Sequence, residues 1–277
     1  MNAIKALLAV GLTLVLVSAA QATVTTVAQY RGGEDDGVSA GDAAGATLVA
    51  TVGNNATLQQ TGSGEFSADT AAPGSTLSVQ LSGGSFSNHA YRADMPAVLL
   101  SRSTNWGLEV WLKMSYPADT PWTESYMHNE QHRAFSVGDG DGNGISITNS
   151  GGVGVWTMEN PRAAVDTALL GQWFNYAMVY TDDGNRTDYI NGEVIAVRAD
   201  SASNMSNGSY QGIWINTTGG YGGNRGWGGM MDEMRVFTFE SGEFEVGDLN
   251  TVVIPEPATM SLLALGGLGM FIKRRRR

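Results

Sequence analysis

One segment of this chain has the ligand types and spacing of a cation site. In Asp139-Gly140-Asp141-Gly142-Asn143-Gly144, oxygen-bearing side chains alternate with glycine. Calcium favours this pattern, because a flexible loop can bring several carboxylate and amide oxygens to one ion. The twelfth position should be Glu, but Ser150 occupies it, which excludes a helix–loop–helix site. We expect either a plain glycine turn or a calcium site formed by Asp139, Asp141 and Asn143.

A second segment could bind sugar. Residues 219–228 form a glycine-rich stretch that contains Tyr221, Asn224, Arg225 and Trp227. Aromatic faces can stack on sugar rings, while amide and guanidinium groups hydrogen-bond to hydroxyls. The alternative is a structural loop whose Trp227 packs back on the core. The same two interpretations hold for Trp106 and Trp122.

Catalytic patterns are incomplete. Glycoside hydrolysis needs two carboxylates about 5–10 Å apart, but Asp232 and Glu233 are adjacent, and neighbours on a strand point to opposite faces. The Gly-x-Ser-x-Gly match at residues 37–41 lies in an acidic loop, without the strand and helix that a nucleophile elbow requires. His128 and His132 have helical metal-site spacing, but the residue after His128 is not the Glu of the metalloprotease motif. We expect no enzymatic activity.

The first 22 residues have the features of a secretory signal peptide. A basic Lys5 precedes an apolar run over residues 6–17, and Ala20-Gln21-Ala22 is a small-x-small cleavage site. We therefore expect the mature chain to begin near Thr23.

The last residues carry a second targeting pattern. A Pro-Glu-Pro tripeptide precedes an apolar run over 258–272 and a basic end. A 15-residue helix spans about 22 Å, less than the ~30 Å hydrocarbon layer, so we expect a transient or snorkelling anchor with its basic end in the cytoplasm. The arrangement resembles the PEP-CTERM sorting signal, which implies processing by an exosortase; an ordinary tail anchor is the alternative. The implied signal residues are Pro255, Glu256, Pro257, Arg274, Arg275, Arg276 and Arg277.

Between these ends lies an acidic domain without cysteine. Residues 23–250 hold 10 basic and 26 acidic residues, a net charge near −16, and Lys113 is their only lysine. Phosphate recognition needs clustered Lys and Arg, so this charge argues against nucleic acid or anionic lipid as a partner, and we expect no nucleic acid to bind. An exported domain without disulfides must be stabilised by its core and its strand pairing.

The hydrophobic pattern of residues 23–250 predicts an all-β fold. Leu108, Val110, Leu112 and Met114 alternate onto one face, and Asn191-Gly192 is a strong hairpin signal. Short β-rich runs between glycine turns favour an antiparallel two-sheet sandwich. The expected strands are 23–30, 47–52, 58–60, 77–81, 107–114, 134–137, 145–148, 154–158, 173–180, 187–190, 193–198, 212–216 and 230–239, with 62–74 as turns.

Several segments together resemble the concanavalin A-like family, in its laminin-G-like jelly-roll branch. They are residues 29–35, 108–113, 172–180, 188–192 (Asp-Tyr-Ile-Asn-Gly) and 228–237, in the family's order. The resemblance implies a jelly roll that ends in a small helix over 243–249. It says little about function, because such sandwiches host lectins, adhesion modules and hydrolases.

Four side chains lead to specific structural expectations. We expect Trp111 and Trp173 to be core residues, because each can bury a large area. In the last strand, alternation places Met230, Asp232, Met234 and Val236 on one face. If this face points inward, Asp232 needs hydrogen-bond partners from a neighbouring loop, and Arg235 on the other face should pair with an acid.

Three functions remain open from the sequence. The first is an exported, non-catalytic module that binds glycan or protein at the cell surface or in the extracellular matrix, and is tethered by its C-terminal helix. The second is a structural surface protein without a discrete ligand. The third is a divergent glycan hydrolase, which the missing acid pair disfavours.

Overall fold

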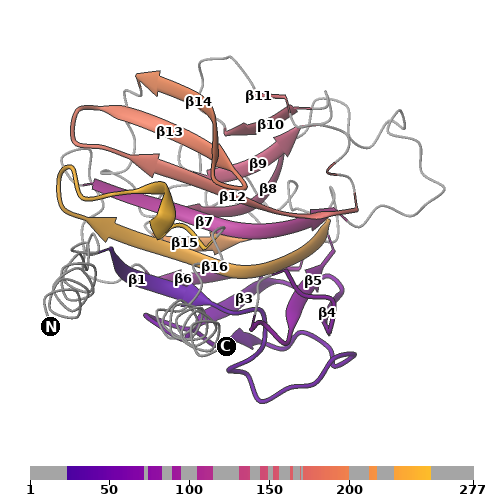
Figure 1. Cartoon of the computed structure of the whole chain (residues 1–277). Helices are drawn as coiled ribbons and strands as arrows, with labels where there is room; N and C mark the ends of the chain where they lie inside the picture. The colour runs from indigo at the N-terminus through magenta and orange to yellow at the C-terminus, as the bar shows by residue number, and fades with distance from the viewer. Residues whose placement is uncertain are drawn as a thin grey trace, which may run out of the picture.

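Two antiparallel sheets packed face to face make up the computed structural model of the chain (Figure 1). The structure describes residues 24–71, 74–82, 89–94, 105–114, 131–137, 144–148, 152–155, 163–164, 169, 171–199, 212–216 and 228–250. The predicted all-β fold of two antiparallel sheets is confirmed.

Sheet A contains eight strands. Their order is β14 (Glu193–Ala199), β13 (Asn185–Ile190), β12 (Trp173–Tyr180), β7 (Asn105–Met114), β16 (Gly229–Phe239), β5 (Ser78–Leu81) and β4 (Gly64–Ser67), and β1 (Thr25–Tyr30) also pairs with β16.

Sheet B also contains eight strands. Their order is β11 (Ala163–Ala164), β10 (Gly152–Val155), β9 (Gly144–Thr148), β8 (Gln131–Val137), β15 (Gly212–Ile215), β6 (Ala90–Asp94), β3 (Ala56–Gln60) and β2 (Thr47–Leu48). Sheet A lies in front of sheet B in Figure 1.

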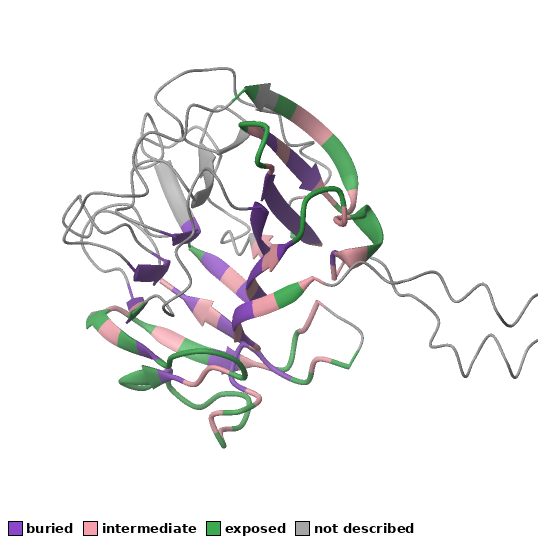
Figure 2. Ribbon diagram, turned by 90° about the vertical axis from the view of Figure 1, so that its left-hand side faces the viewer, coloured by how far each residue is buried: buried purple, intermediate pink, exposed green. Residues whose placement is uncertain are grey.

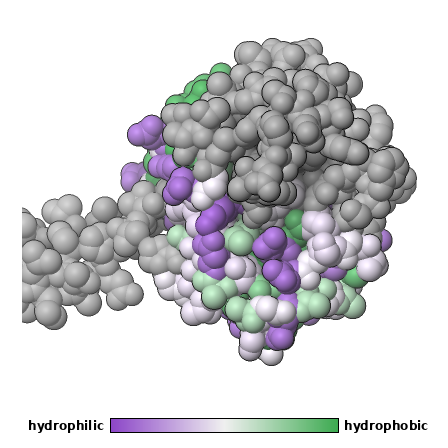
Figure 3. Space-filling model, turned by 90° about the vertical axis from the view of Figure 1, so that its right-hand side faces the viewer, coloured by the Kyte–Doolittle hydropathy of each residue, from purple (hydrophilic) through white to green (hydrophobic). Residues whose placement is uncertain are grey.

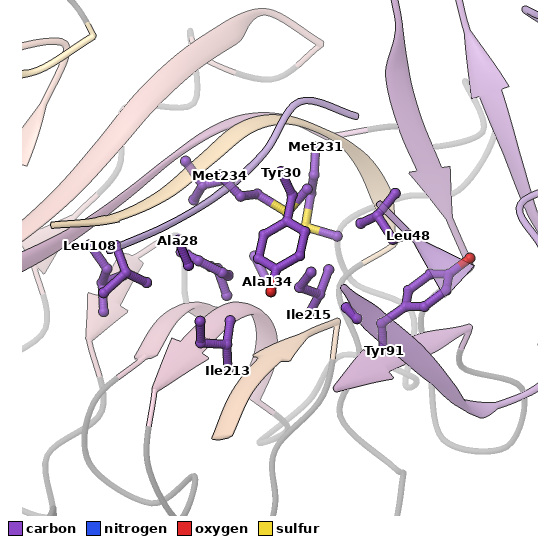
Figure 4. Close-up of a cluster of buried hydrophobic side chains, with 14 of the residues drawn as sticks. Ala28, Tyr30, Leu48, Tyr91, Leu108, Ala134, Ile213, Ile215, Met231 and Met234 are labelled. Carbon is purple, nitrogen blue, oxygen red and sulfur yellow. The ribbon is translucent and has the colours of Figure 1, made fainter. Parts of the chain in front are cut away.

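The main core fills the space between the sheets. Leu108, Val110 and Leu112 point into it as predicted, and Trp106 on the same face stacks on Tyr180 with ring centroids 4.4 Å apart. Both sheets contribute buried side chains (Figures 2 and 4). The labelled members in Figure 4 are Ala28, Tyr30, Leu48, Tyr91, Leu108, Ala134, Ile213, Ile215, Met231 and Met234. On the side of the molecule that Figure 3 shows, hydrophilic and neutral residues make up most of the described surface.

The turn chemistry matches the sequence. Asn191 and Gly192 both adopt positive φ, 50° and 80°, between β13 and β14, as a tight hairpin requires. β8 and β9, which include the expected strands 134–137 and 145–148, pair antiparallel. A short 3-10 helix, η2 (Val246–Asp248), lies within the stretch where the small helix was expected.

A second, smaller hydrophobic cluster lies on the outer face of sheet A. It consists of Ala177, Val179, Tyr189, Phe237, Phe239 and Leu249, with Val24 and Phe244 packed against it. Phe244 and Leu249 belong to the C-terminal segment (residues 240–250), which therefore covers this end of the sheet. Gly107 makes room for Phe237, because a Cβ at Gly107 would lie 2.3 Å from the ring.

Two expectations about orientation are wrong. Trp111 and Trp173 are half-buried on the outer face of sheet A, because the residues beside them, Leu112 and Phe174, are the ones that face the core. In β16, the register shifts between Asp232 and Arg235, and Glu233 adopts φ 47°. This bulge resets the alternation.

As a result, the last strand divides its side chains differently from the prediction. Met231, Met234 and Val236 join the main core, whereas Asp232 lies on the outer face. Strands β4, β6 and β11 were not predicted, and β4 lies inside the stretch expected to be turns.

The predicted targeting segments, residues 1–22 and 251–277, lie outside the described residues. Among the described residues, no helix is long and apolar enough to cross a membrane.

Candidate functional site

A cross-strand row on the outer face of sheet B brings together side chains suited to ligand binding. Thr57, Arg92, Trp214 and Ser136 are register partners across β3, β6, β15 and β8. They point away from the core because their strand neighbours, such as Tyr91 and Ile213, point into it. We call this set the sheet B row.

The centre of the sheet B row is a cation–π pair. The guanidinium carbon of Arg92 lies 5.3 Å from the centre of the Trp214 ring. Arg92 also forms an ion pair with Asp94 at 3.1 Å, and its backbone carbonyl accepts a hydrogen bond from the Thr57 hydroxyl. The Arg92 side chain is 30% exposed and Thr57 is exposed, whereas Trp214 is 8% exposed and Ser136 is fully buried.

Gly212 is needed for this arrangement. A Cβ at Gly212 would lie 3.0 Å from Nε of Arg92 and 2.9 Å from the carbonyl oxygen of Ala93. A larger residue would therefore push the Arg92 side chain out of place. Neither Arg92 nor Trp214 was predicted as a site residue, because neither belongs to a recognisable local pattern.

The strand that carries Trp214 ends in an anchored residue. Asn216 adopts φ 62° and donates hydrogen bonds from Nδ2 to the backbone carbonyls of Ser82 (2.8 Å) and His89 (2.9 Å). Its backbone N–H donates to the carbonyl of Ala134 at 2.7 Å. Asn216 immediately precedes the stretch that holds the predicted sugar-binding residues. Tyr221, Asn224, Arg225 and Trp227 themselves lie outside the described residues.

The predicted calcium residues also lie outside the described part of the chain. β8 ends at Val137 and β9 begins at Gly144, so Asp139, Asp141 and Asn143 belong to the connection of this hairpin. Within the described ranges, no group of three or more His, Asp or Glu side chains is placed to hold a metal.

Buried ionic groups occupy the outer face of sheet A. Glu109 is fully buried, and its Oε1 lies 2.5 Å from Nε of Arg235 in an ion pair. This contact confirms that Arg235 pairs with an acid. Glu109 Oε2 accepts from the backbone N–H of Asn250, and Arg235 donates to the carbonyl of Asp248 at 2.6 Å. The pair therefore fastens the C-terminal segment to the sheet.

The protonation of Glu109 reflects opposing effects. Burial raises its pKa most strongly, while Arg235, the Asn250 N–H and the nearby Asn175 amide act in the opposite direction. The sequence did not single out Glu109, because one acid within an apolar strand does not reveal its partner.

Asp232 is buried on the same face and finds the loop partners that were expected. Its Oδ2 accepts hydrogen bonds from the Ser75 hydroxyl (2.8 Å) and the Ala71 N–H (3.2 Å). Burial raises its pKa to about 7, although these hydrogen bonds favour the charged form. The next residue, Glu233, accepts from Gln29 and Arg31.

Two family models match the chain. A laminin-G-type model, described as the concanavalin A-like lectin/glucanases superfamily, matches residues 86–246. The chain belongs to this superfamily. The second model, the PEP-CTERM protein-sorting motif, matches residues 253–277. Both resemblances noted in the sequence are thereby confirmed, and this concanavalin A-like protein carries the sorting motif of an exported surface protein. No curated protein matches the chain.

Solved structures share the fold at low identity. Domain 4 of AbnA, an extracellular arabinanase from Geobacillus stearothermophilus solved with arabinotriose, is 14% identical with a TM-score of 0.51, over 81% of this chain and 98% of that one. The binding domain of Paraclostridial Mosquitocidal Protein 1 is 13% identical with a TM-score of 0.55, over 82% and 52%. The receptor-binding domain of botulinum neurotoxin D is 15% identical with a TM-score of 0.52, over 82% and 51%. The concanavalin A-like chain thus spans about half of each toxin domain, and these likenesses show the fold alone.

Proposed function

We propose that this protein is an exported, non-catalytic glycan-binding module, which its C-terminal helix holds in the membrane until an exosortase cleaves the chain near Pro255. The observation that carries the proposal is the sheet B row. On one outward face it combines a half-exposed guanidinium, the exposed Thr57 hydroxyl and a largely buried indole ring, and such groups can recognise sugar hydroxyls and ring faces.

The location of the sheet B row supports the proposal. β15 supplies Trp214 and continues through the anchored Asn216 towards Tyr221, Asn224, Arg225 and Trp227. Two sets of sugar-compatible residues therefore belong to one strand and the stretch that follows it. Domain 4 of AbnA was solved in complex with arabinotriose, which agrees with a saccharide ligand for this fold.

The buried carboxylates support the non-catalytic part. Glu109 is paired with Arg235, and Glu233 with Arg31. Asp232 is held by Ser75 and Ala71 beneath a loop. General acid–base catalysis requires carboxyls that reach a substrate, whereas these three stabilise the fold.

A glycan array probed with the full chain in detergent tests the proposal. We expect one class of neutral glycan to bind, and Arg92→Ala to lower the signal at least tenfold. Trp227→Ala should weaken binding if the stretch after β15 takes part. Val197→Ala, an exposed change on β14, is the matched control. An empty array would contradict the proposal and favour a structural surface protein. New reducing ends on a bound glycan would favour the hydrolase.

A further inference from the structure

A buried histidine lies where three connections between the two sheets meet. His89 is 3% exposed and immediately precedes β6 of sheet B, on the connection that comes from β5 of sheet A. Gly62 belongs to the connection from β3 of sheet B to β4 of sheet A, and Gly45 to the one from β1 of sheet A to β2 of sheet B. Polar atoms of His89, Tyr91, Gly45 and Gly62 form one set of hydrogen bonds, which we call the His89 network.

The His89 network consists of three hydrogen bonds in series. Nδ1 of His89 lies 3.2 Å from the carbonyl oxygen of Gly62, and Nε2 lies 2.9 Å from the hydroxyl of Tyr91. The Tyr91 hydroxyl also lies 2.9 Å from the carbonyl oxygen of Gly45. The two rings meet edge to face, with centroids 5.2 Å apart and planes at 67°. In Figure 4 the Tyr91 hydroxyl points away from Ile215, so it leaves the apolar core towards these polar partners.

The number of protons in the His89 network decides which hydrogen bonds can form. A carbonyl oxygen only accepts, so Nδ1 must carry a proton to bond to Gly62. The Tyr91 hydroxyl has one proton, and burial raises its pKa, so it keeps that proton. When the hydroxyl donates to Gly45, it can only accept from His89, and Nε2 must then be a donor as well. All three hydrogen bonds therefore coexist only when both ring nitrogens are protonated, in the imidazolium form.

A neutral His89 ring loses one of the three hydrogen bonds. Nδ1 keeps its proton for Gly62, so Nε2 becomes an acceptor. The single hydroxyl proton of Tyr91 can then go to Nε2 or to Gly45, but not to both. Nε2 belongs to a buried side chain, whereas Gly45 is exposed and water can bond to its carbonyl instead. The hydroxyl should therefore turn to His89 and release Gly45.

The segment that would be released joins the two sheets. The N–H of Ala44 donates to β4, and the carbonyl of Ala46 accepts from β3, both at 2.8 Å. The bond from Tyr91 to Gly45 lies between these two and ties the segment to β6. Its loss should therefore loosen residues 43–47.

Among the described residues, few acidic or basic side chains surround the His89 network. Those on the elements packed against it are Asp36, Asp42, Glu65, Arg92 and Asp94. Asp42 and Glu65 are exposed, and Arg92 and Asp94 form their own ion pair. β3, β5, β15 and residues 83–88 contain no acidic or basic residue. Asp36 is the acid to separate from His89, because its charge acts on Tyr91 and burial raises its pKa.

We propose that the His89 network is a pH-sensitive switch that ties the segment before β2 to β6. Protonation of Nε2 closes the network at Gly45, and loss of that proton opens it there. The switch depends on neither the sheet B row nor the C-terminal tail.

Nitrogen NMR of the full chain in detergent, with isotope-labelled histidine, tests the protonation states between about pH 5 and 8, where imidazole ordinarily changes charge. His89→Gln removes one set of ring signals and thereby identifies those of His89. We expect the neutral ring to carry its proton on Nδ1, and the charged ring to carry protons on both nitrogens. The proposal is overturned if the neutral ring is protonated on Nε2, or if the ring keeps one form throughout this range.

Hydrogen exchange of residues 43–47, measured by mass spectrometry as protection relative to the unfolded peptide, tests the consequence. Protection should fall about threefold or more when His89 loses its proton, which is the effect of one hydrogen bond. Tyr91→Phe should abolish this pH dependence, because no hydroxyl is left to turn. His89→Gln should abolish it too, because its amide can donate to Tyr91 at every pH.

Two further variants are the controls for the exchange experiment. Tyr30→Phe removes another buried hydroxyl, which donates to the carbonyl of Asn54 rather than to a histidine, so the pH dependence of residues 43–47 should persist. It should also persist in Asp36→Asn. The proposal is overturned if Asp36→Asn abolishes the pH dependence, because Asp36 would then be the titrating group, or if Tyr91→Phe retains it.

Discussion

Replacing Arg235 with Met should destabilise the domain much more than an average surface change. The substitution leaves the Glu109 carboxylate, which is fully buried, without its partner at 2.5 Å. Breaking a buried ion pair in this way costs about 3–5 kcal/mol. For a domain of about this size, 1 kcal/mol shifts the Tm by roughly 2–4 °C, so the Tm should fall by about 6–20 °C.

The double variant Glu109→Leu/Arg235→Met gives the decisive comparison. An apolar pair of similar volume avoids the uncompensated charge. It still loses the hydrogen bonds to Asn250 and Asp248, which contribute about 1 kcal/mol each. We therefore expect the double variant to lose only about 2 kcal/mol, less than Arg235→Met alone.

Urea denaturation of wild type, both single variants and the double variant measures this coupling. Val197→Ala controls for a neutral exposed change. The reasoning fails if each single variant costs less than about 1 kcal/mol, or if the two costs simply add, because independent sites are additive and coupled ones are not.

Three more predictions concern Asp232, Gly107 and the two targeting signals. Burial raises the pKa of Asp232 to about 7 in the native state, whereas an Asp in the unfolded chain titrates near pH 4. Between these two pH values the native state holds a proton that the unfolded state has released. The free energy of unfolding should therefore fall by up to about 1.4 kcal/mol per pH unit as the pH rises from about 4 to 7. Urea titrations at several pH values should show that Asp232→Asn lacks this pH dependence. If the variant and the wild type have the same pH dependence, the role given to Asp232 is wrong. Gly107→Ala should cost about 1–3 kcal/mol by overpacking against Phe237, and an unchanged Tm would refute the clash. Mass spectrometry of the mature protein should find Thr23 at the N-terminus and a C-terminus near Pro255, whereas an untrimmed chain would exclude both signals.

Much of the fold could be predicted because local rules and tertiary structure agree. Alternation alone placed Leu108, Val110 and Leu112 in the core, and Asn191-Gly192 fixed the turn between β13 and β14. The same alternation that buried Leu112 also placed Trp111 on the other face. Size suggested a core position for Trp111, but in a strand the face is decided by the period of two.

The parts that could not be predicted depend on tertiary contacts. The bulge at Glu233 inserts one residue into the pairing of β16 with β7, and no turn residue in the sequence signals it. Strand β4 holds only Phe66 as a large buried residue and has no alternating pattern that would distinguish it from a turn.

The sheet B row could not be predicted from the sequence for the same reason. Arg92 and Trp214 are 122 positions apart, and only the pairing of β6 with β15 makes them neighbours. A pattern search within one segment cannot detect such sets.

The second hydrophobic cluster also determines how the domain would be presented when its tail is held. Val24 and Leu249 pack into that one cluster, so both ends of the folded body leave from sheet A. A force on the tail would act first on Leu249 and on the hydrogen bond from the Asn250 N–H to Glu109. The C-terminal segment would therefore detach before the sheets separate. When the tail is held, sheet A would face the surface that holds it. Arg92 and Trp214, on sheet B, would then face away from that surface.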